Sequence, residues 1–111
     1  MLNSFFNALA GGIVVFKERN FRLHVVAAIL ILALGGVVGI SRAETLILLL
    51  LIGVVWSAEA FNTAIEITCD KINPEFDDQI KVIKDVSAFA VLILAFVSVI
   101  IGVLMFWPYL V

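Results

Sequence analysis

The sequence predicts an all-α integral membrane protein with three transmembrane helices and a short N-terminal amphipathic surface helix. Of its 111 residues, 64% are hydrophobic and only 14% are charged, whereas charged residues make up about a quarter of a soluble domain. The apolar residues come in three long blocks, at about 21–40, 45–70 and 86–111, and each block is long enough to cross a bilayer. The length allows no more than one domain, residues 1–111.

Composition also excludes several classes of function. The formal net charge is −2, and there is no basic patch with interleaved aromatic residues, so no nucleic acid partner is expected. The single cysteine, Cys69, excludes an internal disulfide. The phosphate-binding motif G-x-x-x-x-G-K-[ST] and the motifs of soluble protein kinases are missing. A nucleotide site in this chain would therefore be of another kind.

The first element expected is the surface helix, at about residues 3–17. Its large apolar residues recur near helical spacing, and the pattern is typical of a helix that lies in the membrane interface. Gly11-Gly12 weakens this helix, and we expect a bend there. The apolar positions are Phe5, Phe6, Leu9, Ile13 and Phe16.

The three spans follow in order. The first carries no charge from Val25 to Ile40, and a short connection, Ser41–Glu44, leads to the second. The second span, 45–70, is long enough to cross and to project beyond the hydrocarbon at its acidic end.

A polar segment, 71–84, separates the second span from the third. The segment contains the turn signal Asn73-Pro74, and proline is tolerated at the first position of a helix, so we expect a new helix to begin there. The third span, 86–111, has no charged residue and ends in the aromatic run 106–109, which is typical of the membrane–water interface.

Basic residues predict the orientation of the spans. Three precede the first span, three lie between the second and third, and only Arg42 lies between the first and second. The positive-inside bias therefore places the N-terminus and the 71–84 loop in the cytoplasm, where ATP is available. The flanking basic residues are Lys17, Arg19, Arg22, Lys71, Lys81 and Lys84.

The second span carries an unusual polar stripe near its cytoplasmic end. At about 100° per residue, its members fall within an arc of roughly 100° on one face of the helix. Charged residues in a membrane helix are costly, and they usually face a bundle interior and serve a function. The stripe consists of Glu59, Asn62, Thr63, Glu66 and Asp70.

The positions of these residues suit phosphoryl transfer. Glu59 is the deepest carboxylate, and a partly desolvated carboxylate suits a general base near neutral pH. Glu66 and Asp70 lie nearer the headgroups, where a Mg²⁺–nucleotide complex has access. Asn62 can orient a hydroxyl or a phosphate oxygen, and Lys84 offers a point charge for a phosphate.

Each residue also has a structural interpretation. Glu59 can serve as an interhelical hydrogen-bond partner, and Glu66 and Asp70 can be a solvated helix end. Lys84-Asp85 can simply flank the third span, with the carboxylate favoured by the helix dipole. His24 is expected to be an interface residue rather than a metal ligand. The alignment of all members of the stripe on one face favours the functional interpretation.

Two further classes of protein compete with an enzyme. A small proton-coupled multidrug or cation exporter has a similar length, but it needs four spans, usually with its glutamate in the first. A structural membrane subunit leaves the aligned acids unexplained. A polar stripe on a lone three-span chain is hard to shield from lipid, so homo-oligomerisation is expected.

The polar residues resemble the signature of the prokaryotic diacylglycerol kinase family. The resemblance rests on EAFNTAIE at 59–66, followed by Asp70 and Lys84-Asp85, and on the upstream run ERNFRLH at 18–24. It covers nearly the whole chain. Members of the family are small three-span membrane enzymes that work as homotrimers and transfer the γ-phosphate of ATP to a lipid alcohol.

The resemblance implies a role for each matching position. Glu59 becomes the catalytic base, and Asn62 supports the reacting groups. Glu18 and Glu66 become ligands of Mg²⁺ or another divalent cation within the nucleotide site. The remaining ATP contacts implied are Asp70, Glu75, Phe76, Asp77, Lys84 and Asp85.

The chain also departs from the family pattern at several positions. Phe6 stands where the family often has a tyrosine near the nucleotide, and His24 stands at a site that is acidic in one branch. Phe89 replaces a glycine, and its ring is expected to alter helix packing or the nucleotide entry. The N-terminus is also shorter than that of some members.

The family divides by lipid substrate, and the short N-terminus and the ERNFRLH run look more like the undecaprenol branch. The function expected is therefore ATP-dependent phosphorylation of undecaprenol to undecaprenyl phosphate in a bacterial cytoplasmic membrane. The alternative is a diacylglycerol kinase that makes phosphatidic acid.

Overall fold

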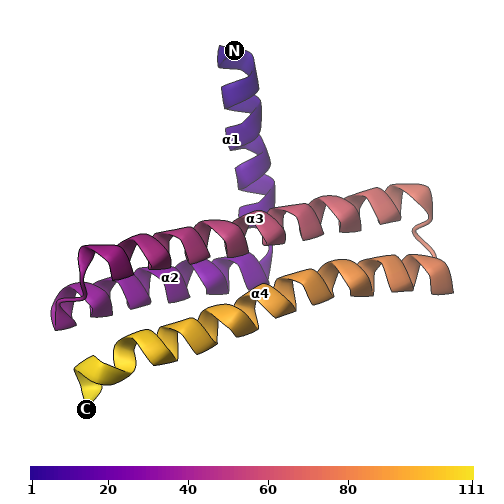
Figure 1. The fold of residues 1–111 in the computed structure, drawn as a ribbon. Coiled ribbons are helices and arrows are strands. Elements are labelled where there is room, and N and C mark those ends of the chain that lie inside the picture. Colours follow the sequence, from indigo (N-terminus) through magenta and orange to yellow (C-terminus); the bar gives the residue numbers. More distant parts are fainter.

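The computed structural model describes all residues of the chain, 1–111, and contains four helices and no strand. The helices α2, α3 and α4 are long and apolar enough to cross a membrane, and α1 leaves this bundle sideways (Figure 1). The predicted fold class, three spanning helices and a short N-terminal helix, is confirmed. The helices are α1 (Leu2–Phe16), α2 (Arg19–Val38), α3 (Arg42–Ile72) and α4 (Asp78–Leu110).

The spanning helices differ in length, and this difference positions the polar residues. With 20 residues, α2 is about 30 Å long, which matches the hydrocarbon layer. With 31 and 33 residues, α3 and α4 reach about 46–50 Å. Both run on past the start of α2 at one end of the bundle (Figure 1). Their polar ends therefore extend beyond the depth that α2 spans.

The helix α3 lies at the centre of the chain. It packs against α2 over its first part and against α4 along much of its length, as Figure 1 also shows. The helix α1 meets the bundle beside the start of α2, and it is continuous through Gly11 and Gly12. The glycines therefore do not interrupt the helix.

The turn between α2 and α3 is fixed by caps at both helix ends. Gly39 ends α2 in the left-handed region, with φ of 77°, a conformation that glycine adopts without steric cost. Ser41 and Glu44 form a capping box at the start of α3, with Ser41 Oγ 3.1 Å from the Glu44 amide and Glu44 Oε1 2.9 Å from the Ser41 amide. The segment expected to be a short connection is therefore mostly the first turn of α3. Tyr109 at the end of α4 donates a hydrogen bond to Glu44.

The segment between α3 and α4 differs from the prediction. No helix begins at Pro74, since Asn73 is extended, as expected for a residue before proline, and its side chain accepts a hydrogen bond from the Glu75 amide at 3.1 Å. The helix α4 begins at Asp78 instead. The Asp77 side chain caps this helix, because it accepts hydrogen bonds from two backbone amides of the first helical turn. The last helix is therefore longer than the predicted span 86–111 and includes the basic residues Lys81 and Lys84.

Few side chains are buried inside the single chain. Only 9 of 111 residues are buried, and most large apolar side chains face outward, as expected for helices solvated by lipid or by other copies. Three of the buried residues are polar: Glu59, Thr63 and Ser87. The interior of this thin bundle is thus partly polar beside the C-terminal half of α3.

Candidate active site

The predicted stripe of α3 is graded in burial. Glu59 and Thr63 are each 4% exposed, Glu66 is half-buried, and Asp70 is exposed. The gradient arises because α2 covers α3 at the depth of Glu59 but does not extend beside the last turns of α3 (Figure 1). The structure therefore agrees with the expectation that Glu59 is the most desolvated carboxylate and that the others lie nearer the polar surroundings.

Asn62 joins α3 to α4 at the middle of this stripe. Its amide nitrogen donates to Oε1 of Glu66 at 3.3 Å, and its amide oxygen accepts a hydrogen bond from the Ser87 hydroxyl at 2.7 Å. These two bonds fix the orientation of the amide and hold the carboxylate one turn away. Asn62 therefore supports the position of the Glu66 carboxylate.

Ser87 is a site residue that the sequence analysis missed. It is buried and lies on α4 just after the charged residues at the start of that helix. The available signal was spacing: Ser87 follows Lys84 by three residues, so the two share one face of α4. A hydroxyl on the same helix face as a functional lysine is a reason to include it in the site.

Lys84 pairs with Asp70 across the two helices. Its ammonium donates to Oδ1 of Asp70 at 2.7 Å, in the polar stretch outside the predicted third span. The hydrogen bond from the ammonium to the Asp70 carboxylate raises the pKa of Lys84, so the lysine remains protonated. A cation and a carboxylate are therefore held together at the exposed end of the stripe, and a polyphosphate that approaches this pair can exchange with the carboxylate.

His24 meets Glu59 at the buried end of the stripe. Its Nδ1 atom, on α2, lies 2.7 Å from Oε1 of Glu59. The ring N–H does not point along the line to the oxygen, and Nδ1 is buried with no other hydrogen-bond partner. The sequence pattern predicts His24 only as an interface residue, because a contact between two helices is not visible in a single sequence.

Several predicted residues lie apart from these contacts. Asp85 pairs with Lys81 on its own helix at 2.6 Å, and Asp77 caps α4. Glu75 and Phe76 are exposed in the connecting segment. No three His, Cys, Asp or Glu side chains are gathered into a group suited to a metal ion.

Glu18 lies at the start of α2, exposed and without a capping hydrogen bond. The contact of His24 with Glu59 links α2 to α3 at the buried end of the stripe. Glu18 precedes His24 by six residues, or about 9 Å of helix rise. It therefore lies at the end of α2 that is remote from the turn between α2 and α3.

Phe6 and Phe89, two positions that depart from the family pattern, are both exposed, at 61% and 58%. Phe89 therefore does not pack between helices of its own chain. Of the two effects considered for its ring, an altered nucleotide entry stays a prediction.

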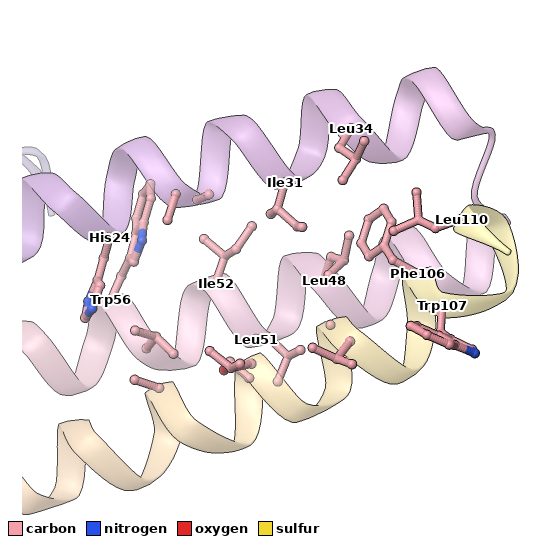
Figure 2. A pocket seen from close by; sticks show the side chains of 18 residues that line it. His24, Ile31, Leu34, Leu48, Leu51, Ile52, Trp56, Phe106, Trp107 and Leu110 are labelled. Atoms are coloured by element: carbon pink, nitrogen blue, oxygen red, sulfur yellow. The ribbon is translucent and has the colours of Figure 1, made fainter.

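An apolar groove runs along the bundle as far as His24, the residue that approaches Glu59. It has a volume of about 630 Å³ and is lined by residues of α2, α3 and α4, nearly all of them hydrophobic. Figure 2 shows His24 and Trp56 at one end of the groove and Trp107 and Leu110 at the other. The groove arises because α2 and α4 each pack on α3 and leave space between themselves.

Comparison with known proteins agrees with this geometry. Residues 6–106 match the family described as prokaryotic diacylglycerol kinase. The chain is 45% identical over 91 residues to the undecaprenol kinase of Bacillus subtilis, covering 82% of this chain and 74% of that protein. It is 31% identical over 104 residues to a diacylglycerol kinase of Synechocystis, covering 92% of this chain and 59% of that protein.

A bundle of three spanning helices with a buried glutamate, a polar seam and an apolar groove defines a multi-pass membrane protein equipped for chemistry on a lipid. The chain belongs to the prokaryotic diacylglycerol kinase family. It is a membrane lipid kinase, with ATP as co-substrate.

Proposed function

We propose that this kinase phosphorylates undecaprenol to undecaprenyl phosphate, with diacylglycerol as the alternative acceptor. The observation that carries the proposal is the buried carboxylate of Glu59, 4% exposed, near the end of an apolar groove that His24 lines. A lipid alcohol with its hydrocarbon beside the groove would present its hydroxyl at that carboxylate. The choice of undecaprenol is supported by the 45% identity to the Bacillus undecaprenol kinase.

Glu59 acts as the general base. Its carboxylate accepts the proton of the lipid hydroxyl while that oxygen attacks the γ-phosphorus of ATP. The bond between the γ-phosphorus and the β–γ bridging oxygen breaks, and ADP leaves with that oxygen. Burial of Glu59 excludes water from the acceptor position and so limits hydrolysis of ATP.

Glu18 and Glu66 would hold the divalent cation, Mg²⁺. Mg²⁺ in nucleotide sites uses one or two carboxylates together with phosphate oxygens and water, and two glutamates fit this donor set. Asn62 holds Oε1 of Glu66 and leaves Oε2 available. When bound, the cation neutralises charge on the phosphates.

The exposed end of the stripe binds the rest of the nucleotide. Lys84 supplies a positive charge for a phosphate, and its pairing with Asp70 holds it at the end of α3. The other proposed contacts come from the α3–α4 connection and the start of α4: Glu75, Phe76, Asp77 and Asp85.

The assembly proposed is a homotrimer in the bacterial cytoplasmic membrane, with the N-terminus and the 71–84 segment in the cytoplasm. Outward-facing apolar residues dominate the single chain. One side of α3 also carries a shallow hollow with Gly53, Ser57 and Ala58. Small residues spaced four apart let membrane helices approach closely, so this side of α3 suits contact with another copy.

The substrate is tested by offering undecaprenol and diacylglycerol side by side to the purified protein with γ-labelled ATP and Mg²⁺. We expect label on both lipids to be measurable and undecaprenol to give the higher kcat/KM. Strong preference for diacylglycerol would contradict the choice of substrate. Absence of label on any lipid alcohol would contradict the kinase mechanism.

A further inference from the structure

His24 is the only histidine in the chain, and its contact has a chemical consequence. An ionised carboxylate can only accept hydrogen bonds, so Nδ1, 2.7 Å from Oε1 of Glu59, can bond to it only as an N–H donor. Nδ1 is buried and has no hydrogen-bond partner in the structure. A buried donor needs an acceptor, and Oε1 of Glu59 is the one within hydrogen-bond distance.

We propose that His24 is the positioning residue of Glu59: it donates Nδ1–H to Oε1 and thereby directs Oε2 toward the lipid hydroxyl. This inference rests on the proposed function of Glu59 as the base. A glutamate side chain has three rotatable bonds, and a fixed hydrogen bond removes the freedom that would misdirect its proton-accepting oxygen. The arrangement is the reverse of a serine protease triad, in which a carboxylate orients a histidine base.

The location of His24 adds a second reason for this assignment. The same side chain lines the apolar groove, and Figure 2 shows it at the groove end beside Trp56. The next carboxylates of the stripe lie further along α3, where Glu66 bonds to Asn62 and Asp70 bonds to Lys84. His24 is therefore the ionisable side chain that contacts both the base and the groove.

The contact itself can be tested without any enzymatic reaction. With ¹⁵N-labelled histidine, the spectrum of the protein in bilayers contains one imidazole, because the chain has one histidine. We expect protonated Nδ1, and a change in the Nδ1 shift in Glu59→Gln, because an amide is a weaker acceptor than a carboxylate. An unprotonated Nδ1, or an Nδ1 shift identical in wild type and Glu59→Gln, would contradict the pairing.

The catalytic consequence is tested with matched substitutions of His24. His24→Asn keeps an N–H near the position of Nδ1, whereas His24→Leu keeps apolar bulk and removes the donor. We expect His24→Leu to lower kcat about tenfold or more with KM for ATP near the wild-type value, and His24→Asn to recover much of the loss. The factor corresponds to about 1.4 kcal/mol, close to the lower end of what a hydrogen bond to a charged group contributes.

A double-mutant cycle separates positioning from mere packing. If His24 acts through Glu59, His24→Leu causes little further loss in a Glu59→Gln background. Equal losses in both backgrounds, or equal activity of His24→Leu and wild type, would contradict the proposal. Thr45→Val is the control, because Thr45 lies outside the groove and its hydroxyl bonds to the Ser41 carbonyl at the start of α3.

The two sets of measurements distinguish failure of this inference from failure of the proposed function. A wild-type protein that phosphorylates no lipid alcohol would overturn the function and with it the catalytic role of His24. The spectrum of the imidazole would still decide whether the contact exists. An active kinase with an unpaired imidazole would overturn the inference alone.

Discussion

At the scale of single residues, the carboxylates of α3 differ in what surrounds them. Glu59 is buried against a histidine, whereas Glu66 is half-buried and held by an amide. Asp70 is exposed and paired with a lysine. These three environments support three roles: a proton acceptor, a metal ligand and a partner of the phosphate-binding cation.

The metal-binding role proposed for Glu66 and Glu18 predicts a specific kinetic effect. Glu66→Gln removes one negative charge at almost constant shape, so it tests ligation rather than packing. We expect both Glu18→Gln and Glu66→Gln to raise the Mg²⁺ concentration for half-maximal activity, by roughly tenfold for a loss of about 1.4 kcal/mol. The measurement is turnover across a Mg²⁺ titration at fixed ATP.

Glu44→Gln is the control for the general effect of removing a carboxylate. Glu44 caps the start of α3 at the opposite end of the bundle, so it should leave the Mg²⁺ requirement unchanged. Wild-type Mg²⁺ dependence in both Glu18→Gln and Glu66→Gln would remove these residues from the metal site.

At the scale of elements, α3 and α4 are joined at both ends by polar contacts. Asp70 with Lys84 and Asn62 with Ser87 connect them at one end, and Glu44 with Tyr109 connects them at the other. Between these contacts, the apolar parts of α3 and α4 lie side by side and form one wall of the groove. The polar contacts of the candidate site therefore depend on the register between α3 and α4.

Two lysines on α4 provide a matched pair for testing the nucleotide site. Lys84 pairs across to α3, whereas Lys81 pairs with Asp85 on its own helix. We expect Lys84→Gln to raise KM for ATP by roughly tenfold, because an exposed phosphate contact is lost. This factor corresponds to a loss of about 1.4 kcal/mol of binding free energy. Lys81→Gln should leave KM for ATP close to the wild-type value. Equal effects of the two substitutions would show that Lys84 contributes only general positive charge.

Much of this architecture was predictable from the sequence, and the failures have physical causes. Apolar blocks fixed the number of spans, and helical periodicity aligned Glu59 with Asn62 and Glu66 on one face. The start of α4 was misplaced because Asn73 and Asp77 act through local side-chain hydrogen bonds that favour an extended turn and a later cap. These bonds are not visible in hydrophobic periodicity.

The contacts of His24 and Ser87 were beyond prediction for a different reason. Both depend on the register between helices that are distant in sequence, and a single sequence does not give that register. Roles carried by resemblance, such as metal binding by Glu18, still require the experiments described above.

At the scale of the whole molecule, the single chain is a thin, open bundle with only 9 buried residues. The proposed trimer would cover part of its apolar surface, including the side of α3 that carries Gly53. A Cβ at Gly53 meets nothing within 4 Å in the single chain, so Gly53→Leu is compatible with the fold of one copy.

We expect Gly53→Leu to weaken the trimer by preventing close helix approach. Gly36→Leu is the control, because Gly36 of α2 is equally unobstructed in the single chain but lies outside this hollow. The measurement is the mass of the complex in detergent across a range of protein concentrations. Unchanged mass for Gly53→Leu would exclude this side of α3 from the interface.

The central claim is that Glu59 takes the proton from the lipid hydroxyl. Its most direct test is the turnover of purified Glu59→Gln, measured together with its affinity for ATP. General base catalysis contributes about 10²–10⁴-fold, so turnover should fall by at least about 10²-fold while ATP binding is retained. Turnover within a few-fold of wild type in a well-folded Glu59→Gln protein would contradict the claim.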